Sequence, residues 1–235
     1  MAPAVIYLFL ISIISLLVYA PQLWIRFVIK KHSAELSQLP GTGGELAEHL
    51  IRHFGIKDVG VEKTQANQDH YSPEDKKVRL SPNVYDGRSL SAIAIAAHEV
   101  GHAIQFFRQD KVTQLGNRFM PLAMIIEKIS IGIMFAIPVV TAILKVPHAA
   151  VLTALVGVIG MLASVLFQLM VLPMEWDASF NKAMPILIKG EYISEEQVPA
   201  IRSVLRAAAF TYVAAALANI LSLWRWLAIL RGAIR

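Results

Sequence analysis

Long apolar segments separate the polar regions of the chain. Ala2 to Ala20 and Ala149 to Pro173 contain no charged residue, and each is long enough to cross a bilayer as a helix. Ile129 to Leu144 is apolar throughout, and Ala207 to Leu230 is a weaker segment because it contains an asparagine and an arginine. The pattern predicts a mainly α-helical membrane protein with about four hydrophobic helices.

Shorter periodic patterns follow the first apolar segment. Thr42 and Glu45 are spaced as a capping box and predict a helix start. Alternating apolar residues predict a strand over Ile56 to Thr64, and two more strands are expected at Gln68 to Tyr71 and Lys77 to Ser81. We expect a short antiparallel sheet whose exposed edge is a candidate site for an extended peptide to add as a strand.

An uninterrupted helical pattern runs from Arg88 to Arg108 and contains the sequence His98-Glu-Val-Gly-His102. Histidines four residues apart lie on one helix face, so both imidazoles can bind one tetrahedral cation. Glu99 follows the first histidine, where a carboxylate can accept a proton from a metal-activated water. Gly101 costs about 1 kcal/mol relative to alanine in a helix, which predicts close packing there. The alternative is a pair of core histidines beside a surface glutamate.

A second histidine pair is found earlier in the chain. His49 and His53 are also four residues apart, but the residue after His49 is Leu50, so the general base is missing. We interpret this pair as part of a solvated helix face.

A third metal ligand is expected after the third apolar segment. The chain has no cysteine, so the metal must be held by histidine and carboxylate side chains. Glu175 is our first choice, Asp177 is the second choice or a partner of a ligand, and Ser179 lies four residues after Glu175 on the same helical face. Two apolar segments separate His102 from Glu175, so both return to the same side of the membrane. The alternative interpretation of the acidic pair is a helix N-terminal cap.

Composition supports a membrane protein. Of the 235 residues 56% are hydrophobic and 17% are charged, and the mean hydropathy of +0.54 excludes an ordinary soluble protein. Met1 to Ala20 lacks a basic region and a cleavage site, which predicts an uncleaved anchor. The net charge is +5. Most basic residues that flank the apolar segments lie on the side of the histidine motif, so the positive-inside rule predicts that the site faces the cytoplasm. No nucleic-acid-binding pattern is present.

These patterns divide the chain into five segments. We expect an N-terminal membrane anchor, a catalytic region with the histidine helix, a transmembrane hairpin, a third-ligand helix with its connection, and a C-terminal hydrophobic helix. Their ranges are 1–31, 32–118, 119–172, 173–206 and 207–235.

The runs HYSPEDKKVRLSPNVYDGRSLSAIAIAAHEVGHAIQ, LPMEWDASFNKA and RAAAFTYVAAAL resemble the YugP-type neutral zinc metallopeptidases of bacterial membranes, and the similarity extends over essentially the whole chain. The resemblance implies a gluzincin in which His98, His102 and Glu175 bind zinc and Glu99 is the base. More distantly, the chain is similar to integral-membrane peptidases in which an aspartate four residues after the ligand glutamate braces a histidine. Here that position is Ser179, so the bracing is weaker or falls to Asp177.

The sequence therefore predicts a zinc metalloendopeptidase of the bacterial inner membrane, with one Zn²⁺ per chain and polypeptide substrates that include membrane proteins. A donor to the tetrahedral oxyanion is required; Tyr212, Arg206 and His70 are candidates, and we favour Tyr212. One alternative is a non-catalytic, zinc-stabilised scaffold or chaperone. A second alternative is a metal-handling transporter.

Overall fold

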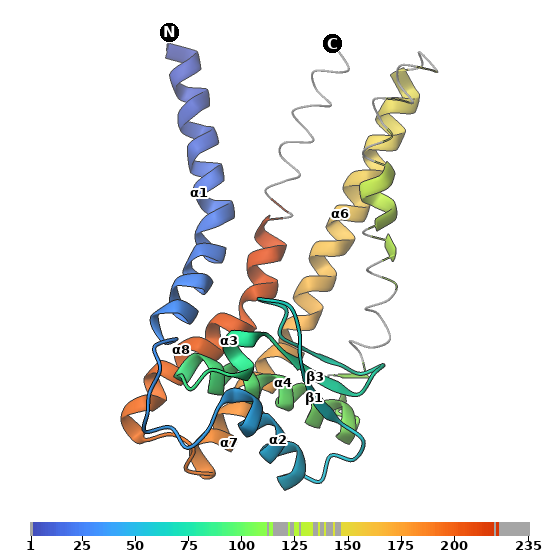
Figure 1. Ribbon diagram of the computed structural model, residues 1–235. Helices are drawn as coiled ribbons and strands as arrows, with labels where there is room; N and C mark the ends of the chain where they lie inside the picture. Colours follow the sequence, from blue (N-terminus) through green and yellow to red (C-terminus); the bar gives the residue numbers. More distant parts are fainter. Residues whose placement is uncertain are drawn as a thin grey trace. The chain divides into compact units, whose positions relative to one another are not determined.

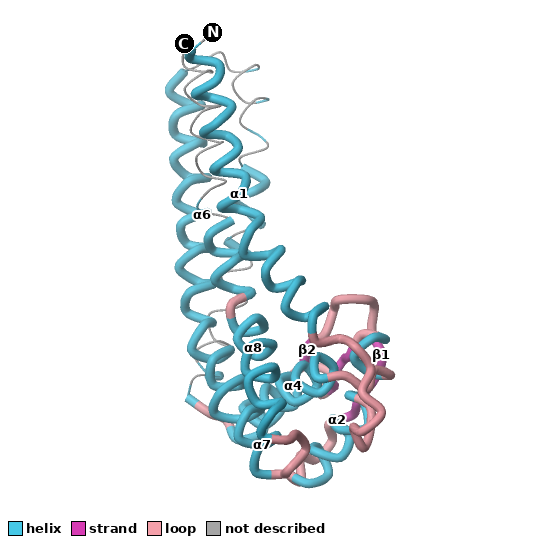
Figure 2. Tube along the Cα trace, turned by 90° about the vertical axis from the view of Figure 1, so that its left-hand side faces the viewer, coloured by secondary structure: helices cyan, strands magenta, loops and turns pink. Residues whose placement is uncertain are grey.

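The computed structural model describes residues 2–111, 113–114, 147–218 and 220, and also positions 122, 125–126, 128–133, 136, 139 and 143. The chain is mostly helical (Figures 1 and 2). It forms two compact units. The first consists of Met1–Gln22, Leu115–Leu172 and Tyr212–Arg235, and the second of Leu23–Gln114 and Pro173–Thr211.

The first unit contains most of the long helices α1 (Ala2–Lys31) and α6 (Pro147–Trp176). Apolar side chains that include Leu155, Ile159, Leu162 and Leu166 are exposed along α6. Their spacing of three or four residues places them on one face of the helix, and an exposed apolar face of this length suits a lipid environment.

Two helices in the described part of the chain are long and apolar enough to cross a membrane, judged by length and composition: Leu155–Lys189 and Glu195–Ala218. They overlap the third and fourth expected segments. The first expected segment is helical within α1, and its role as a span stays a prediction. Half of the second, Ile129 to Leu144, lies outside the described residues, and its role as a span also stays a prediction. The expectation of a mainly helical protein is confirmed, and two of the four hydrophobic helices are shown.

The second unit combines short helices with a three-stranded sheet. In chain order its elements are α2 (Gly43–His53), β1 (Gly60–Lys63), β2 (His70–Ser72), β3 (Lys77–Leu80), α3 (Pro82–Tyr85), α4 (Leu90–Arg108), η1 (Asp177–Ala183, a π-helix), α7 (Met184–Lys189), η2 (Glu195–Gln197, a 3₁₀-helix) and α8 (Val198–Ala209).

Helix α4 is the centre of the second unit and contacts α2, α3, α7, α8, η1, β2 and β3. Its start is fixed by Ser89, whose hydroxyl accepts a hydrogen bond from the amide of Ala92 at 3.1 Å. Its end is fixed by Gln109, which adopts a left-handed conformation with φ of 54°. Small residues such as Ala96 and Ala97 are fully buried, which lets neighbouring helices approach the axis closely.

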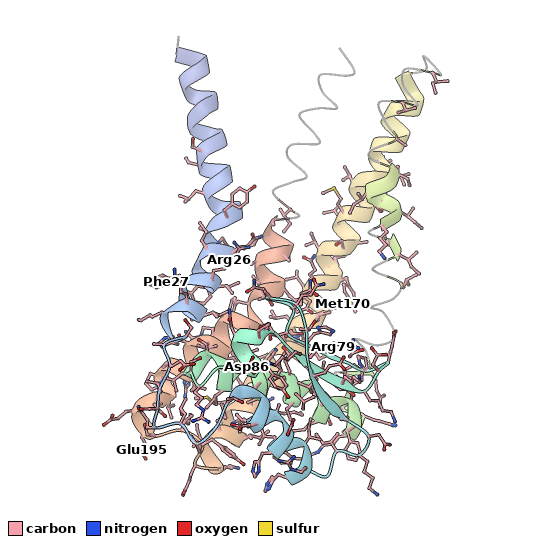
Figure 3. All side chains as sticks on the ribbon, in the orientation of Figure 1. Arg26, Phe27, Arg79, Asp86, Met170 and Glu195 are labelled. Atoms are coloured by element: carbon pink, nitrogen blue, oxygen red, sulfur yellow. The ribbon has the colours of Figure 1, made fainter. Side chains whose placement is uncertain are left out.

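The sheet corrects one expectation. Its strand order is β1-β3-β2, with β3 antiparallel to β2 but parallel to β1, so the purely antiparallel arrangement was wrong. Charge pairs connect the two parallel strands. Glu62 on β1 stands opposite Arg79 on β3, accepts a hydrogen bond from its Nε at 2.7 Å, and also pairs with Lys77 (Figure 3, where Arg79 is labelled).

A second correction concerns the helix after the third apolar segment. We expected this segment to end at Pro173 and a new helix to begin, but α6 continues through Pro173 to Trp176 and passes directly into η1. The close packing predicted at Gly101 is confirmed, because a β-carbon there would lie 2.8 Å from the carbonyl oxygen of Ala178 in η1. This close approach brings the segment around Glu175 against α4.

Candidate metal centre

Three side chains from α4 and the end of α6 converge in the second unit. His98 Nε2 lies 3.2 Å from Oε2 of Glu175, and His102 Nε2 lies 3.5 Å from the same oxygen. The two Nε2 atoms are 3.2 Å apart. His98, His102 and Glu175 are each less than a tenth exposed, and in the described part of the chain they form a group that could hold a metal ion.

The geometry of the three ligand atoms fits a zinc ion. Zinc bonds of about 2.0–2.2 Å at tetrahedral angles place neighbouring ligand atoms about 3.3–3.6 Å apart. The separations of 3.2, 3.2 and 3.5 Å are close to the edges of such a tetrahedron. Three protein ligands leave a fourth position for water or substrate, as in catalytic rather than structural zinc sites.

A serine hydroxyl orients the first histidine. Ser179 Oγ donates a hydrogen bond to the carbonyl of Leu205 at 3.2 Å and lies 3.0 Å from Nδ1 of His98. Because the hydroxyl has one proton and gives it to the carbonyl, it must accept from Nδ1–H of His98. The proton of a neutral His98 is thereby held on Nδ1, and the lone pair of Nε2 is directed towards the other two ligands.

A glutamine orients the second histidine. The amide oxygen of Gln105 lies 3.0 Å from Nδ1 of His102, and an amide oxygen can only accept, so Nδ1 carries the proton. The orientation of this amide follows from its other partners, because Gln105 Nε2 donates to the carbonyl of Met174 at 2.9 Å and to Oδ2 of Asp177 at 2.7 Å. Gln105 is fully buried. Its position three residues after His102, on the same helix face, was a signal that the sequence analysis did not use.

Asp177 connects this network to a wider set of ion pairs. Its Oδ2 is 2.6 Å from Nζ of Lys182, which is also 2.7 Å from Asp110, and its Oδ1 accepts from the amide of Asn181 at 2.9 Å. The π-helical η1 brings residues five apart onto one face, which aligns Lys182 with Asp177. Asp177 is therefore a partner of Gln105 rather than a member of the three-residue group.

Burial and neighbouring charge shift the protonation of the centre. Burial lowers the pKa of His102, but the nearby Glu175 carboxylate outweighs this effect and raises it to about 9. The Glu175 carboxylate therefore favours a positive charge beside it at His102. Glu99 is 7% exposed, and burial raises the pKa of its carboxyl group, although the two histidines act in the opposite direction.

The remaining candidates lie in several different elements. Tyr212 is half-buried in the helix after α8 and belongs to the first unit. Arg206 is exposed on α8, and His70 is exposed on β2 with its Nδ1 2.7 Å from the carbonyl of Gln68. The choice among these three as oxyanion donor stays a prediction.

The fold and centre define a membrane-associated protein with a buried two-histidine, one-carboxylate group. Residues 6–231 match the model of the family described as "Putative neutral zinc metallopeptidase", and the chain belongs to this family. It is 34% identical over 211 residues to the "Putative membrane protease YugP" of Bacillus subtilis (strain 168), covering 88% of this chain and 90% of that protein. No solved structure matches the chain. The resemblance inferred from the sequence is confirmed.

Proposed function

We propose that the protein is a membrane-embedded zinc metalloendopeptidase of the gluzincin type. The observation that carries the proposal is the convergence of His98 Nε2, His102 Nε2 and Glu175 Oε2 within 3.5 Å of one another. The proposed ligands are these three atoms, with one Zn²⁺ per chain. The hydrogen bonds of Ser179 and Gln105 support the assignment, because both keep the Nε2 lone pairs available.

Glu99 is the proposed general base. When bound, zinc supplies Lewis acidity that polarises the scissile carbonyl and lowers the pKa of water towards about 7. The Glu99 carboxylate accepts the proton of the attacking water and delivers it to the leaving amine. Burial raises the pKa of this carboxyl group, which supports its role in accepting and returning a proton.

The oxyanion that forms during attack needs a hydrogen-bond donor. Tyr212 is the proposed donor because a phenol can donate without a change in charge and because its segment resembles the family sequence. Arg206 and His70 are the alternatives, and a comparison of Tyr212→Phe with Arg206→Gln and His70→Gln ranks the three. Replacement of the true donor should lower kcat without a loss of bound zinc.

The proposed location is the bacterial inner membrane, in several spans with the centre facing the cytoplasm. The two long apolar helices and the excess of basic residues near the histidine motif support it. Substrates are proposed to be polypeptides, including membrane proteins.

The test uses the full-length protein purified in detergent. Zinc content and cleavage of a casein-type substrate are measured for the wild type, for Glu99→Gln and for the exposed control Glu196→Gln. The proposal predicts stoichiometric zinc in all three proteins and loss of cleavage only in Glu99→Gln. Cleavage that survives in Glu99→Gln would refute the peptidase mechanism. A wild type that binds zinc without cleaving would favour a scaffold, and zinc flux across vesicles would favour a transporter.

A further inference from the structure

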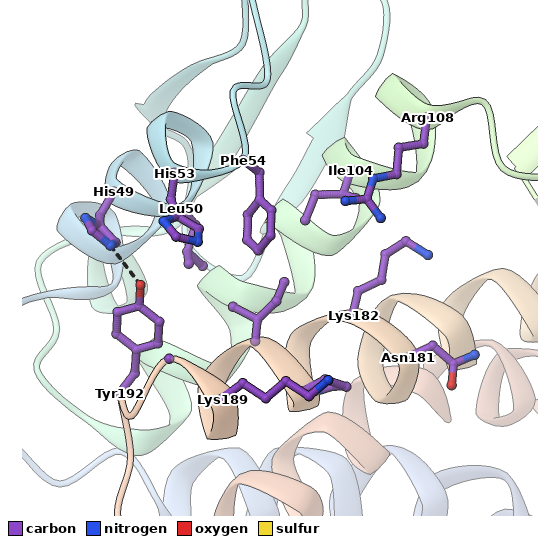
Figure 4. A pocket seen from close by; sticks show the side chains of 13 residues that line it. His49, Leu50, His53, Phe54, Ile104, Arg108, Asn181, Lys182, Lys189 and Tyr192 are labelled. Carbon is purple, nitrogen blue, oxygen red and sulfur yellow. Dashed lines mark hydrogen bonds between the residues drawn. The ribbon is translucent and has the colours of Figure 1, made fainter.

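A cavity lies in the second unit, between α2, the C-terminal part of α4, and η1 with α7 (Figure 4). Its volume is about 580 Å³, within the range of small-molecule sites. None of the three proposed zinc ligands lines it. Ile104 and Arg108 of α4 do line the cavity. They lie on a different face of α4 from His98 and His102, because about 100° of rotation separates successive helix residues.

The cavity has an apolar surface. Leu50 and Ile104 are at most 2% exposed and form part of its wall, and Phe54 and Ile186 extend this wall while remaining half-buried. Figure 4 shows Phe54 and Ile104 near each other on the α2 and α4 side. A ligand that fills this space would therefore bury a hydrocarbon or ring portion.

The charged residues that line the cavity are all basic: Arg108, Lys182 and Lys189. Lys182 is already paired with Asp110 and Asp177. Arg108 and Lys189 have no ion pair within the described part of the chain, and both are exposed at the cavity. Lys182 and its two carboxylate partners together carry one negative charge. Arg108 and Lys189 add two positive charges, so these five groups leave a net charge of one positive unit.

Two histidines of α2 line the far side of the cavity. His49 and His53 are stacked with ring centroids 6.0 Å apart, and Nε2 of His49 is 2.7 Å from the hydroxyl of Tyr192 (Figure 4). These side chains offer polar hydrogen-bonding groups to a ligand, which agrees with the interpretation of this pair as exposed residues of α2.

We propose that this cavity binds a singly charged amphiphilic anion. Its carboxylate or phosphate group lies between Arg108 and Lys189, and its apolar part packs against Leu50 and Ile104. One negative charge balances the net charge of the cavity, and the guanidinium of Arg108 suits the planar or branched oxygens of either group. The site does not depend on the peptidase activity, since none of these four residues belongs to the zinc centre.

The test is isothermal titration of the full-length protein in an uncharged detergent. The probes are octanoate, dihexanoyl phosphatidylglycerol and inorganic phosphate. Dihexanoyl phosphatidylcholine, which is zwitterionic, is the control for the phosphatidylglycerol. The variant Arg108→Gln/Lys189→Gln removes the two unpaired cations. Lys57→Gln/Arg202→Gln is the matched control, because it removes one lysine and one arginine that are exposed elsewhere in the same unit.

We expect octanoate or the phosphatidylglycerol to bind with one site per chain. Binding should weaken about tenfold or more in Arg108→Gln/Lys189→Gln and stay unchanged in the control, because two charge-assisted contacts are lost. Binding of octanoate alone identifies a free carboxylate as the source of the ligand, and binding of the phosphatidylglycerol alone identifies a lipid headgroup. Inorganic phosphate should bind more weakly than either amphiphile.

Three results would overturn the proposal. The first is equal affinity in Arg108→Gln/Lys189→Gln and in the wild type. The second is the absence of binding by both amphiphilic anions at millimolar concentration. The third is equal affinity for the phosphatidylcholine and the phosphatidylglycerol, or for inorganic phosphate and octanoate, because the charge or the apolar wall would then contribute nothing. Circular dichroism of each variant checks that these surface substitutions leave the fold intact.

Discussion

Ser179 follows Glu175 by four residues, and its hydroxyl lies 3.0 Å from Nδ1 of His98. This neutral hydroxyl occupies the position at which the more distantly similar membrane peptidases have an aspartate. Since the same hydroxyl donates to the Leu205 carbonyl, it can serve His98 only as an acceptor. One buried serine therefore joins α4, η1 and α8 and fixes the proton position of a proposed zinc ligand.

Removing this hydroxyl should weaken zinc binding without unfolding the protein. In Ser179→Ala, His98 loses its acceptor, and loss of such a partner costs about 10- to 100-fold in metal affinity. Competition with a chromophoric zinc chelator measures the change. Ser33→Ala removes an exposed hydroxyl that bonds only to the nearby carbonyl of Lys30 and should keep the wild-type affinity. Unchanged zinc affinity in a folded Ser179→Ala would show that the serine does not orient His98.

Gln105 should affect both zinc affinity and stability. Gln105→Leu approximately preserves side-chain volume but removes the acceptor for His102 and the donors to Met174 and Asp177. We expect zinc affinity to fall at least tenfold and the free energy of unfolding to fall by about 1–3 kcal/mol, because buried polar groups lose their partners. Chelator competition and chemical denaturation measure the two effects. The exposed Gln114→Leu is the control, and a Gln105→Leu variant that behaves like it would contradict this role.

The packing of α4 against η1 can be tested at one glycine. A methyl group at Gly101 would lie 2.8 Å from the carbonyl oxygen of Ala178, whereas one at Gly60 would meet nothing within 4 Å. Gly101→Ala should therefore lower the free energy of unfolding by about 1–3 kcal/mol through overpacking, and it should weaken zinc binding by displacing Glu175. Gly60→Ala should do neither. Equal melting temperatures for the two variants would argue against the close approach.

The charge pairs of the sheet predict a pH-dependent contribution to stability. Hydrogen bonds from Lys77 and Arg79 hold the pKa of Glu62 below its usual value. A carboxyl group whose pKa is lowered in the folded state stabilises the fold above its unfolded pKa of about 4.3, and loses this effect as the pH falls through the folded pKa. The melting temperature of Glu62→Gln should lie below that of the wild type at pH 7 and approach it near pH 3. A pH-independent difference would contradict the prediction, and Glu196→Gln is the control.

The three residues that converge in the centre were predicted from helical periodicity and from an expected topology. Periodicity aligns His98 with His102, and the expectation of two apolar segments between His102 and Glu175 placed both on one side of the membrane. The helix start at the capping box of Thr42 and Glu45 was also predicted correctly. These features depend on residues that are close in sequence or on simple topology.

The features that the sequence analysis missed depend on tertiary contacts. The parallel pairing of β1 with β3 places Glu62 beside Lys77 and Arg79 across the sheet. The π-helix η1 accompanies the approach of Ala178 to Gly101 and the pairing of Lys182 with Asp177. Neither has a periodic signature in the amino-acid sequence. Gln105 was different, since its spacing from His102 was visible but its partners came from a segment about seventy residues away.

Zinc stoichiometry in Glu175→Gln and Asp177→Asn is the most direct test of the central claim that α4 and Glu175 hold one metal ion together. Both variants remove one acidic group within three residues of each other, but only Glu175 lies within 3.5 Å of both imidazoles. After dialysis against zinc-free buffer, elemental analysis should find about one zinc per chain in the wild type and in Asp177→Asn, and almost none in Glu175→Gln. Full zinc content in Glu175→Gln, or its loss from Asp177→Asn alone, would contradict the account.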